Sequence, residues 1–416
     1  MNIYLETYGC TANKSDEAII RGLLQKQNCT FVDSIEDADQ LILLTCTVIG
    51  TTEQRMLSRL RAFKKTRKPI IVTGCMPTVQ ADLILSIAPE ATLLLPHYIH
   101  YITEIMAQKK PAFTTTKKTL YPKTYTGVIA PLSIAEGCNL ACSYCITHLT
   151  RGTLRSFPID EIVVDVRTAL SQGCKEIQLT AQDTASYGLD TRTNLGALLS
   201  HVVQVPGEYR LRVGMMNPLT LKKHIPEILP MFAHPKLYRF LHLPVQSGDN
   251  DILRKMKRGY TIDEFLDIVS RFRTTYPDIT LSTDIIVGFP TETDHQFQRT
   301  LQLIKDVKPD ITNITRFSAR PSTAAKTMKG RVPTDIVKIR SSQLAELCSQ
   351  ISLEKNRQHL GKIYTVLVTE KGKRNTMTGR TATYKQVVLK EPVQLGTFVE
   401  TMMIDATPTH LVGNLI

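Results

Sequence analysis

The sequence predicts an α/β protein in three parts: an open parallel α/β sheet domain, then an incomplete (β/α) barrel, then a small all-β barrel. Three observations predict this order. Short apolar strands alternate with helical patterns over residues 1–108, the alternation resumes over residues 127–355, and short β-like runs dominate residues 356–416. A chain of 416 residues is long enough for two or three domains, each with a core of its own.

The first part, residues 1–108, repeats a strand followed by a helix three times. Its strands are NIYLETY, LILLT and PIIVTG, and the helices that follow begin at about Lys14, Thr51 and Val79. Cys10, Cys46 and Cys75 come directly after the three strands. Because the carboxyl ends of parallel strands share one edge of a sheet, where ligands bind, we expect these thiols to converge as a ligand set.

The second part follows a linker, residues 109–126, which is rich in Lys, Thr and Pro and has no apolar periodicity. Six strand candidates then alternate with helical patterns: IAPLSIAEG, KEIQLTAQ, YRLRVGM, YRFLHLPVQ, ITLSTDIIVG and ITNITRFSA. Six such units predict a (β/α) barrel with its site at the carboxyl ends of the strands. A long helix over about residues 333–360 leads into the last part.

The last part contains the β-like runs IYTVLVTE, QVVLK, TFVETMMIDA and HLVGNLI, separated by Gly, Lys and Thr turns. This pattern is typical of a small β-barrel of a kind often used to bind RNA. A purely structural cap is the alternative.

The chain carries 51 Lys and Arg against 38 Asp and Glu, a formal net charge of +13. Such an excess favours a polyanionic partner such as nucleic acid, although a merely basic soluble enzyme would show it too. The excess is concentrated in RAFKKTRK, KKPAFTTTKK, RKMKRGY and KGKRNTMTGR.

The expected compartment of the protein bears on the use of its cysteines. Nothing near Met1 resembles a signal peptide, and no apolar run approaches the roughly 20 residues needed to span a bilayer, so we expect a cytoplasmic protein without a membrane partner. Thiols stay reduced there, so nine irregularly spaced cysteines indicate metal binding or catalysis and not a disulfide framework. Cys29, Cys174 and Cys348 fit no ligand set, and we expect them to be core or incidental residues.

Three further cysteines, Cys138, Cys142 and Cys145, lie in EGCNLACSYCITHLTRG, just after the first strand of the predicted barrel. Two kinds of ligand fit this Cys-x3-Cys-x2-Cys spacing. His148 would complete a Cys3His set for zinc. An iron-sulfur cluster usually takes four thiolates, so three would leave one iron open for a substrate or cofactor. The cluster is favoured, because a barrel-strand position and a second triad are both awkward for a structural zinc site.

This loop resembles that of the radical S-adenosylmethionine enzymes, whose signature is the same spacing with an aromatic residue before the last cysteine, here Tyr144. The resemblance implies that Cys138, Cys142 and Cys145 hold a [4Fe-4S] cluster. It also implies that the amino and carboxylate groups of S-adenosyl-L-methionine chelate the fourth iron. Reductive cleavage of that cofactor would give a 5′-deoxyadenosyl radical, which can take hydrogen from an unactivated carbon.

The wider chain is similar to the methylthiotransferases, and the likeness covers nearly all of it. The segments that carry it are YGCTANKSDEAII, LLTCTVIGTTEQR, TGCMP, TRGTLRSFPIDEIV, LHLPVQSGDNDILRKMKRGY and DIIVGFPTET. The resemblance implies that Cys10, Cys46 and Cys75 bind a second, auxiliary [4Fe-4S] cluster, which holds the sulfur that is delivered. It also implies that residues 127–355 are the radical SAM barrel and residues 356–416 a TRAM domain, an RNA-binding module.

Two segments indicate the branch of this family. Ser156 to Pro158 form Ser-Phe-Pro where bacterial enzymes acting on isopentenyladenosine tend to have Ser-Arg-Pro, and RVGMMNP also resembles the archaeal and eukaryotic branch. That branch modifies N6-threonylcarbamoyladenosine, so the resemblance implies methylthiolation at C2 of this nucleoside at position 37 of tRNA. The membrane-anchoring tail of the eukaryotic members is missing after HLVGNLI, which favours an archaeal-type soluble form.

Other functions stay open. The enzyme could act on isopentenyladenosine-37 of tRNA or on a ribosomal protein side chain; the basic β domain and Ser-Phe-Pro count against the latter. A non-catalytic, zinc-containing RNA-binding protein is the more distant alternative. Besides tRNA, the chemistry implies an electron donor and a sulfur source, both unidentified, and we expect a monomer.

Polar residues at barrel-strand ends are the candidates for contact with S-adenosylmethionine: Gln182, Gln246, Asp284 and Arg320, with Tyr144 from the cysteine loop. Where many radical enzymes carry Gly-Gly-Glu this chain has LTAQDTASYG, and Ser322 stands where relatives often have Gly. No catalytic residue is assigned beyond the cluster ligands. The candidates for RNA binding, with Tyr384 among them as a stacking side chain, are Lys371, Lys373, Arg374, Arg380 and Lys385. A solubilising hairpin is the alternative for that segment.

Overall fold

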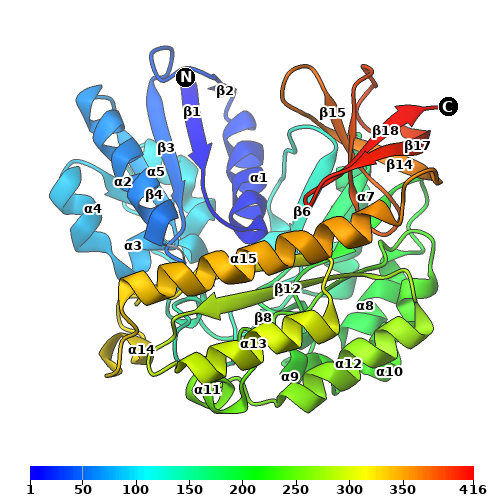
Figure 1. Ribbon diagram of the computed structural model, residues 1–416. Coiled ribbons are helices and arrows are strands. Elements are labelled where there is room, and N and C mark those ends of the chain that lie inside the picture. The colour runs from blue at the N-terminus through cyan, green and yellow to red at the C-terminus, as the bar shows by residue number, and fades with distance from the viewer. Residues whose placement is uncertain (49) are drawn as a thin grey trace.

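The computed structural model describes residues 1–48 and 50–416 and contains three parts in the predicted order (Figure 1). The first part is a parallel sheet in the order β2-β1-β3-β4-β5. Its strands are β1 Asn2–Thr7, β2 Thr30–Phe31, β3 Gln40–Thr45, β4 Ile70–Gly74 and β5 Thr92–Leu93. Its helices are α1 Thr11–Gln25, α2 Gly50–Lys65, α3 Met76–Val79, α4 Ala81–Ile87, the 3-10 helix η1 Pro96–Tyr101 and α5 Ile102–Met106.

Strand β3 is buried throughout because helices cover both faces of this sheet. Alternate side chains of a strand point to opposite faces. Leu43 packs with Leu60 of α2 on one face, whereas Leu44 packs with Ile19 of α1 on the other. A continuous apolar run such as LILLT is what a strand covered on both faces requires.

The second part is an incomplete barrel of parallel strands, as predicted. Two three-stranded sheets, β10-β9-β6 and β11-β12-β13, are joined by a parallel bridge between Leu211 and Leu237. β6 and β13 are therefore edge strands, and α1 lies against β6, where Ser133 N donates to Ser15 Oγ at 3.1 Å. The strands are β6 Ile129–Ser133, β9 Glu176–Thr180, β10 Arg210–Val213, β11 Phe240–His242, β12 Thr280–Val287 and β13 Ile311–Arg316. β7 Ala135–Glu136 and β8 Arg155–Ser156 form a separate antiparallel pair.

The incomplete barrel formed by β6 and β9–β13 is called the half-barrel below. Helices follow its strands and cover its outer face (Figure 1). Two of them, α12 (Ile262–Thr275) and α13 (Asp294–Val307), begin at capping boxes in which Thr261 pairs with Glu264 and Thr293 with Gln296. The helical elements are α6 Thr147–Arg151, α7 Ile159–Ser171, η3 Thr184–Ser186, α8 Leu195–Val202, α9 Pro218–Leu221, α10 Ile225–Ile228, η4 Leu229–Ala233, α11 Asn250–Lys255, α12 Ile262–Thr275, α13 Asp294–Val307, α14 Ala324–Thr327 and α15 Thr334–Arg357. Across residues 1–48 and 50–416, no helix has the length and apolar character to cross a membrane.

The third part is a closed barrel in the order β14-β15-β16-β18-β17. Its strands are β14 Ile363–Lys371, β15 Met377–Arg380, β16 Gln386–Leu389, β17 Phe398–Ala406 and β18 Leu411–Leu415. Strand β15 was not expected, because KGKRNTMTGR has charges and glycines where an apolar run would signal a strand. Met377 nevertheless packs into the small core with Val366 and Val387. The helix α15 leads into this barrel and extends past the expected border at residue 355.

The expected linker joins the first two parts through buried charges. Lys118 Nζ is buried and lies 2.6 Å from Asp16 Oδ1 and 2.7 Å from Glu136 Oε1. Lys123 Nζ is also buried and lies 2.7 Å from Asp165 Oδ1. Buried ion pairs are costly to break from one side, so this segment is fixed in place although it has no apolar periodicity.

Candidate metal centres and cofactor cavity

The structure brings Cys10, Cys46 and Cys75 together at the carboxyl edge of the first sheet. The strands that they follow, β1, β3 and β4, are neighbours in that sheet. Gly9 has a φ of +106°, and a Cβ atom there would lie 2.7 Å from the Cβ of Cys46, so only glycine fits this close approach. Burial raises the pKa of the Cys46 thiol to about 12, and the nearby thiols of Cys10 and Cys75 add to the shift.

The second triad, Cys138, Cys142 and Cys145, lies on the loop between β7 and α6. Two backbone N–H groups of this loop donate to Cys138 Sγ and Cys145 Sγ, both at 3.4 Å. Cys142 Sγ accepts from Arg258 Nη1 at 3.2 Å. Burial raises the pKa of Cys138 to about 12 and also raises that of Cys145. Each sulfur of this triad therefore has a hydrogen-bond donor directed at it.

This donor set fits an iron-sulfur cluster. Both triads consist of thiols alone, and hydrogen bonds to the ligand sulfurs are a means by which proteins tune such clusters. A [4Fe-4S] cluster spreads its thiolates over separate irons, so it needs a wider arrangement than one ion does. In the part of the chain that the structure describes, no group of three or more His, Cys, Asp or Glu side chains is close enough to hold a single metal ion. His148 Nδ1, which the zinc alternative would involve, lies 2.7 Å from the carbonyl oxygen of Cys138.

Arg151 links the two triads. It ends α6, the helix after the second triad, and is buried with Nη1 2.7 Å from Asp16 Oδ2. Burial alone would lower the pKa of this guanidinium, but Asp16 and Cys75 hold it well above its usual value. Cys10 contributes in the same direction. The charge of Arg151 therefore lies beside the first triad, while its backbone continues the loop of the second.

A cavity of about 310 Å³, called the cofactor cavity below, lies at the carboxyl ends of the half-barrel strands. Val48 from the first part and Cys145 from the second both line it, so the two parts share its wall. The fold places ligand sites at this end of the strands. Four of the five predicted cofactor residues line the cavity, namely Tyr144, Gln246, Asp284 and Arg320.

Asp284 and Gln246 lie side by side in this cavity. Asp284 Oδ1 accepts from Asn313 Nδ2 at 2.8 Å and lies 3.0 Å from His242 Nε2. Burial opposes its charge, but His242 and Asn313 hold the pKa of Asp284 below its usual value. The backbone N–H of Gln246 bonds to the Asp284 carbonyl, and its φ of +72° is a left-handed conformation that costs about 1 kcal/mol or more for a residue with a Cβ.

Arg320 enters the cavity from the loop after β13. Its Nη2 lies 2.6 Å from Glu53 Oε2 of α2. Its Nε and Nη1 are buried and have no hydrogen-bond partner among the described residues. Each of these nitrogens can donate a charge-assisted hydrogen bond to an anionic group of a ligand. Ser322 nearby has a φ of +58°, which explains why glycine suits this position.

Gln182, the fifth predicted residue, is placed outside the cavity wall that the described residues form. Its Oε1 accepts from the backbone N–H of Gly137 at 2.7 Å, so it holds the segment that leads to Cys138. The neighbouring Asp183 is buried and accepts from Ala185 N, Asn217 N and Thr220 Oγ1, so it supports the loops behind the triad.

Sequence reasoning missed Arg258 and Arg151. Their segments, RKMKRGY and TRGTLR, resemble solvent-exposed basic runs by composition, yet both arginines are buried. Arg258 Nη1 contacts Cys142 Sγ and also lies 3.3 Å from Tyr144 OH. A signal was present, because both arginines stand in segments that carry the family likeness.

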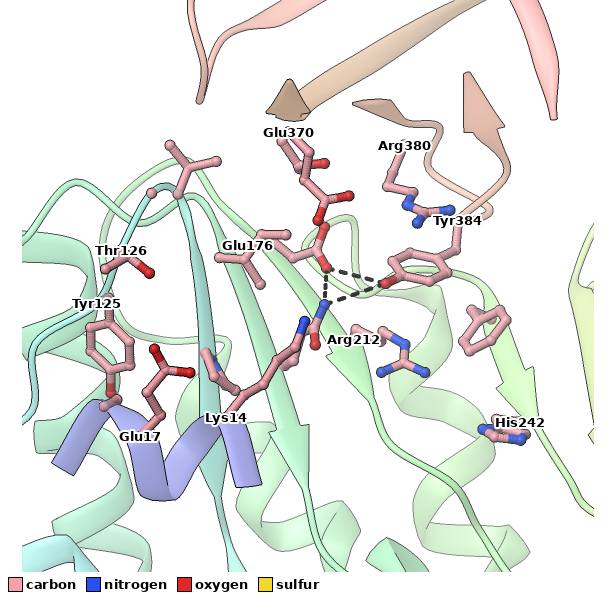
Figure 2. A pocket seen from close by; sticks show the side chains of 18 of the residues that line it. Lys14, Glu17, Tyr125, Thr126, Glu176, Arg212, His242, Glu370, Arg380 and Tyr384 are labelled. Carbon is pink, nitrogen blue, oxygen red and sulfur yellow. Dashed lines mark hydrogen bonds between the residues drawn. The ribbon is translucent and has the colours of Figure 1, made fainter. Parts of the chain in front are cut away.

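A larger cavity of about 600 Å³ runs along the inner face of the half-barrel, between α1 and the C-terminal barrel (Figure 2). His242 and Asn313 line both cavities, so the larger cavity reaches the cofactor cavity. Lys14 of α1 and Arg380 of β15 contribute positive charge to its wall. This cavity was not expected from the sequence.

The predicted RNA-binding residues divide into two groups. Lys371, Lys373 and Arg374 are exposed at the turn between β14 and β15, and Arg380 lines the larger cavity. Lys385 is different: its Nζ is buried and lies 2.7 Å from Asp310 Oδ1.

Burial sets Lys385 and Tyr384 apart from the exposed residues among these candidates. Lys385 Nζ also donates to Asn356 Oδ1, so its charge serves the joint between α15 and the C-terminal barrel. Tyr384 is buried between that barrel and the half-barrel, with its OH bonded to Glu176 Oε1 at 3.2 Å and its ring 4.7 Å from that of Phe240. Neither side chain is presented to a nucleic acid from outside.

Comparisons with known proteins agree with this architecture. Residues 132–304 match the Radical SAM superfamily model and residues 2–96 match the model called Uncharacterized protein family UPF0004. Among solved structures, the radical S-adenosylmethionine methyltransferase TsrM from Kitasatospora setae shares the fold, with a TM-score of 0.59 and 10% identity over 88% of this chain and 80% of that chain. The cobalamin-dependent radical enzyme OxsB shares it with a TM-score of 0.52 and 11% identity over 84% of this chain and 55% of that chain.

Curated relatives align with the whole chain. It is 39% identical to the "Probable threonylcarbamoyladenosine tRNA methylthiotransferase" of Pyrococcus horikoshii, over 100% of both chains. It is 39% identical to the protein of that name from Archaeoglobus fulgidus, over 100% of this chain and 99% of that one. It is 33% identical to the "Threonylcarbamoyladenosine tRNA methylthiotransferase" of Drosophila melanogaster, over 100% of this chain and 77% of that one. With the radical SAM domain and the two cysteine triads, this likeness shows that the chain belongs to the threonylcarbamoyladenosine tRNA methylthiotransferase family of radical SAM enzymes.

Proposed function

We propose that this protein methylthiolates C2 of N6-threonylcarbamoyladenosine at position 37 of tRNA. The observation that carries the proposal is the pair of cysteine triads at one interface, joined by Arg151. The names of the full-length relatives support the choice of nucleoside.

The residues present fit two [4Fe-4S] clusters. Cys138, Cys142 and Cys145 would hold the one that works with S-adenosylmethionine, and Cys10, Cys46 and Cys75 would hold the auxiliary one. When bound, the first cluster and S-adenosylmethionine supply a 5′-deoxyadenosyl radical, which can take hydrogen from an unactivated carbon such as C2 of adenine.

Side chains of the cofactor cavity would bind and orient S-adenosylmethionine. Arg320 has N–H groups that are unpaired among the described residues and can donate to an anionic group, and Asp284, whose charge His242 and Asn313 stabilise, can accept hydrogen bonds from amino or hydroxyl groups. Tyr144 and the apolar side chains of the wall restrict access of water to the site.

The tRNA would be held mainly by its phosphates. The exposed Lys371, Lys373 and Arg374 and the cavity residue Arg380 supply positive charge near the larger cavity. Position 37 lies in a loop, where a base can leave the stack and enter a pocket, and the larger cavity leads from this basic region to the cofactor cavity. The proposal also requires an electron donor and a sulfur source, and it places the protein in the cytoplasm with its substrate.

Mass analysis of tRNA nucleosides from cells lacking the gene tests the proposal. We expect loss of 2-methylthio-N6-threonylcarbamoyladenosine, accumulation of its precursor, and restoration by the wild-type gene but not by a Cys142→Ala gene. Unchanged levels of every 2-methylthioadenosine derivative would contradict the proposal. Loss of the isopentenyl derivative alone would assign the other tRNA substrate.

A further inference from the structure

The larger cavity contains a cation, Arg212, that forms no ion pair with any of the described residues. Arg212 extends from β10 into this cavity, beneath the ring of Tyr384 (Figure 2). Its guanidinium carbon lies 5.3 Å from the centre of the Phe240 ring and 5.2 Å from that of Tyr384. Two aromatic rings therefore fix the plane of the guanidinium.

No described carboxylate neutralises Arg212. Its Nε is buried without a hydrogen-bond partner, and no Asp or Glu oxygen among residues 1–48 and 50–416 lies within 4.0 Å of its nitrogens. Glu176 shares the cavity wall, but its oxygens are taken by the hydroxyls of Tyr238 and Tyr384 and by the amide of Gln178. Figure 2 shows the bond between Glu176 and Tyr384, with Arg212 close by and not joined to Glu176.

A buried donor without a partner costs about 1–3 kcal/mol, and more when it is charged. A guanidinium offers a planar pair of N–H donors that matches a carboxylate better than it matches a neutral group. The chemistry of this cavity therefore favours a ligand that ends in a carboxylate.

The distance to the reaction site is also suitable. Phe240, which packs against Arg212, and His242, which lines both cavities, are alternate residues of β11 and are roughly 6.6 Å apart along the strand. In N6-threonylcarbamoyladenosine, seven bonds separate C2 of the base from the threonine carboxylate, a reach of roughly 8 Å. A nucleoside whose C2 lies at the cofactor cavity can therefore place its threonine carboxylate two strand residues further into the half-barrel, at Arg212.

We infer that Arg212 binds the threonine carboxylate of N6-threonylcarbamoyladenosine and thereby selects this nucleoside. The inference rests on the proposed function and deepens it. An isopentenyl substituent would leave the buried Nε of this guanidinium unpaired among the described residues. Sites built for a polar partner reject analogues that lack it far more strongly than apolar pockets reject a missing methylene.

The test uses tRNA ligated from fragments that carry at position 37 either N6-threonylcarbamoyladenosine or its analogue with a carboxamide in place of the carboxylate. Anaerobically prepared full-length protein is compared as wild type, Arg212→Gln, Arg212→Lys and Arg210→Gln. The last is the matched control, because Arg210 lies on the same strand with its guanidinium over Phe398, outside the cavity. Iron content and cleavage of S-adenosylmethionine without tRNA report whether each variant is intact.

We expect the wild type and Arg210→Gln to prefer the carboxylate tRNA by about tenfold to hundredfold in kcat/KM, as charged hydrogen bonds do. Arg212→Gln should lose that preference through slower reaction of the carboxylate tRNA, and Arg212→Lys should keep part of it. An unchanged preference in Arg212→Gln, or equal losses on both substrates in an otherwise intact variant, overturns the inference and leaves the proposed function standing. A wild type that modifies neither tRNA overturns both.

Discussion

Arg258 Nη1 lies 3.2 Å from Cys142 Sγ, and the arginine is buried. Its other contacts fix it there, since its Nε donates to Tyr260 OH at 3.1 Å and its Nη2 to the Pro244 carbonyl oxygen at 3.4 Å. A buried positive charge that donates to a ligand sulfur favours the more negative state of a metal cluster. Arg258 is thus a positioning residue that can tune the second triad.

Replacing Arg258 by methionine should lower the reduction potential of the cluster at this triad. We expect a shift on the order of 50 mV, since a tenfold change in a one-electron equilibrium corresponds to 59 mV. A redox titration followed by electron paramagnetic resonance measures it. The control is Arg254→Met, since Arg254 is an exposed arginine at the end of α11. Equal reduction potentials in the Arg258→Met and Arg254→Met variants would show that Arg258 does not tune the cluster.

Substitutions in the two triads should abolish different steps of the reaction. Cys142→Ala should abolish cleavage of S-adenosylmethionine, whereas Cys46→Ala should leave this cleavage measurable and stop sulfur insertion. Two [4Fe-4S] clusters also predict about eight irons per chain in anaerobically prepared protein. Replacing all three cysteines of either triad should lower this to about four. Sulfur insertion by Cys46→Ala would show that the first triad is not required for this step.

The exposed turn between β14 and β15 should dominate the salt dependence of tRNA binding. Changing Lys371, Lys373 and Arg374 together to serine should weaken binding and reduce the slope of log K against log salt by about 2 to 3. Filter binding over a range of salt concentrations measures the slope. Lys305→Ser, on the exposed face of α13, should change neither quantity. An unchanged slope in the triple variant would place the phosphate contacts elsewhere.

Lys385 should affect stability and not RNA binding. Lys385→Met removes one of the two lysines that form ion pairs with Asp310 among the described residues and leaves Lys355, 2.7 Å away, so it should destabilise the joint between α15 and the C-terminal barrel by about 3 kcal/mol. Chemical denaturation measures this loss, and the salt slope of tRNA binding in the folded variant should match the wild type. A stable variant with a smaller slope would restore Lys385 to the RNA-binding surface.

The C-terminal barrel should weaken on mild acidification because of His359. Burial, with Lys385 and Lys362 nearby, lowers the pKa of His359 to about 4, and its Nδ1 lies 2.7 Å from Tyr364 OH. The unfolded chain takes up this proton near pH 6.5, so the contribution of His359 is complete above that pH and is lost as the pH falls toward 4.

Wild-type protein should therefore lose on the order of 1–2 kcal/mol more unfolding free energy between pH 7 and pH 5 than a His359→Gln variant loses. Urea unfolding at the two pH values measures the difference. Equal losses in the two proteins would show that His359 is not the titrating group.

Local signals in the sequence predicted the strands and the triads. The strands β3 and β4 are buried along their whole length, which the apolar runs LILL and IIV indicate, and the spacing of Cys138, Cys142 and Cys145 lies within one loop. The convergence of Cys10, Cys46 and Cys75 followed from topology, since each comes after a strand of one parallel sheet.

Contacts between distant segments could not be predicted. Arg258 meets Cys142 across 116 residues of sequence and Lys385 meets Asp310 across 75, so composition alone made both look like exposed charges. Strand β15 has no apolar run that would reveal it in the sequence. It is a strand because its backbone pairs with β14 on one side and β16 on the other. The position of Arg212, which forms no ion pair with any described residue, depends on the packing of β10 against β11 and the C-terminal barrel.

One measurement tests the central claim most directly: nucleoside analysis of N6-threonylcarbamoyladenosine-containing tRNA after incubation with anaerobically prepared protein, S-adenosylmethionine and a reductant. With about eight irons per chain, the account predicts conversion of the nucleoside at position 37 to its 2-methylthio derivative, and no conversion when Cys10, Cys46 and Cys75 are replaced by alanine. A fully iron-loaded protein that cleaves S-adenosylmethionine but leaves the nucleoside unchanged, or a triple variant that still converts it, would contradict the account.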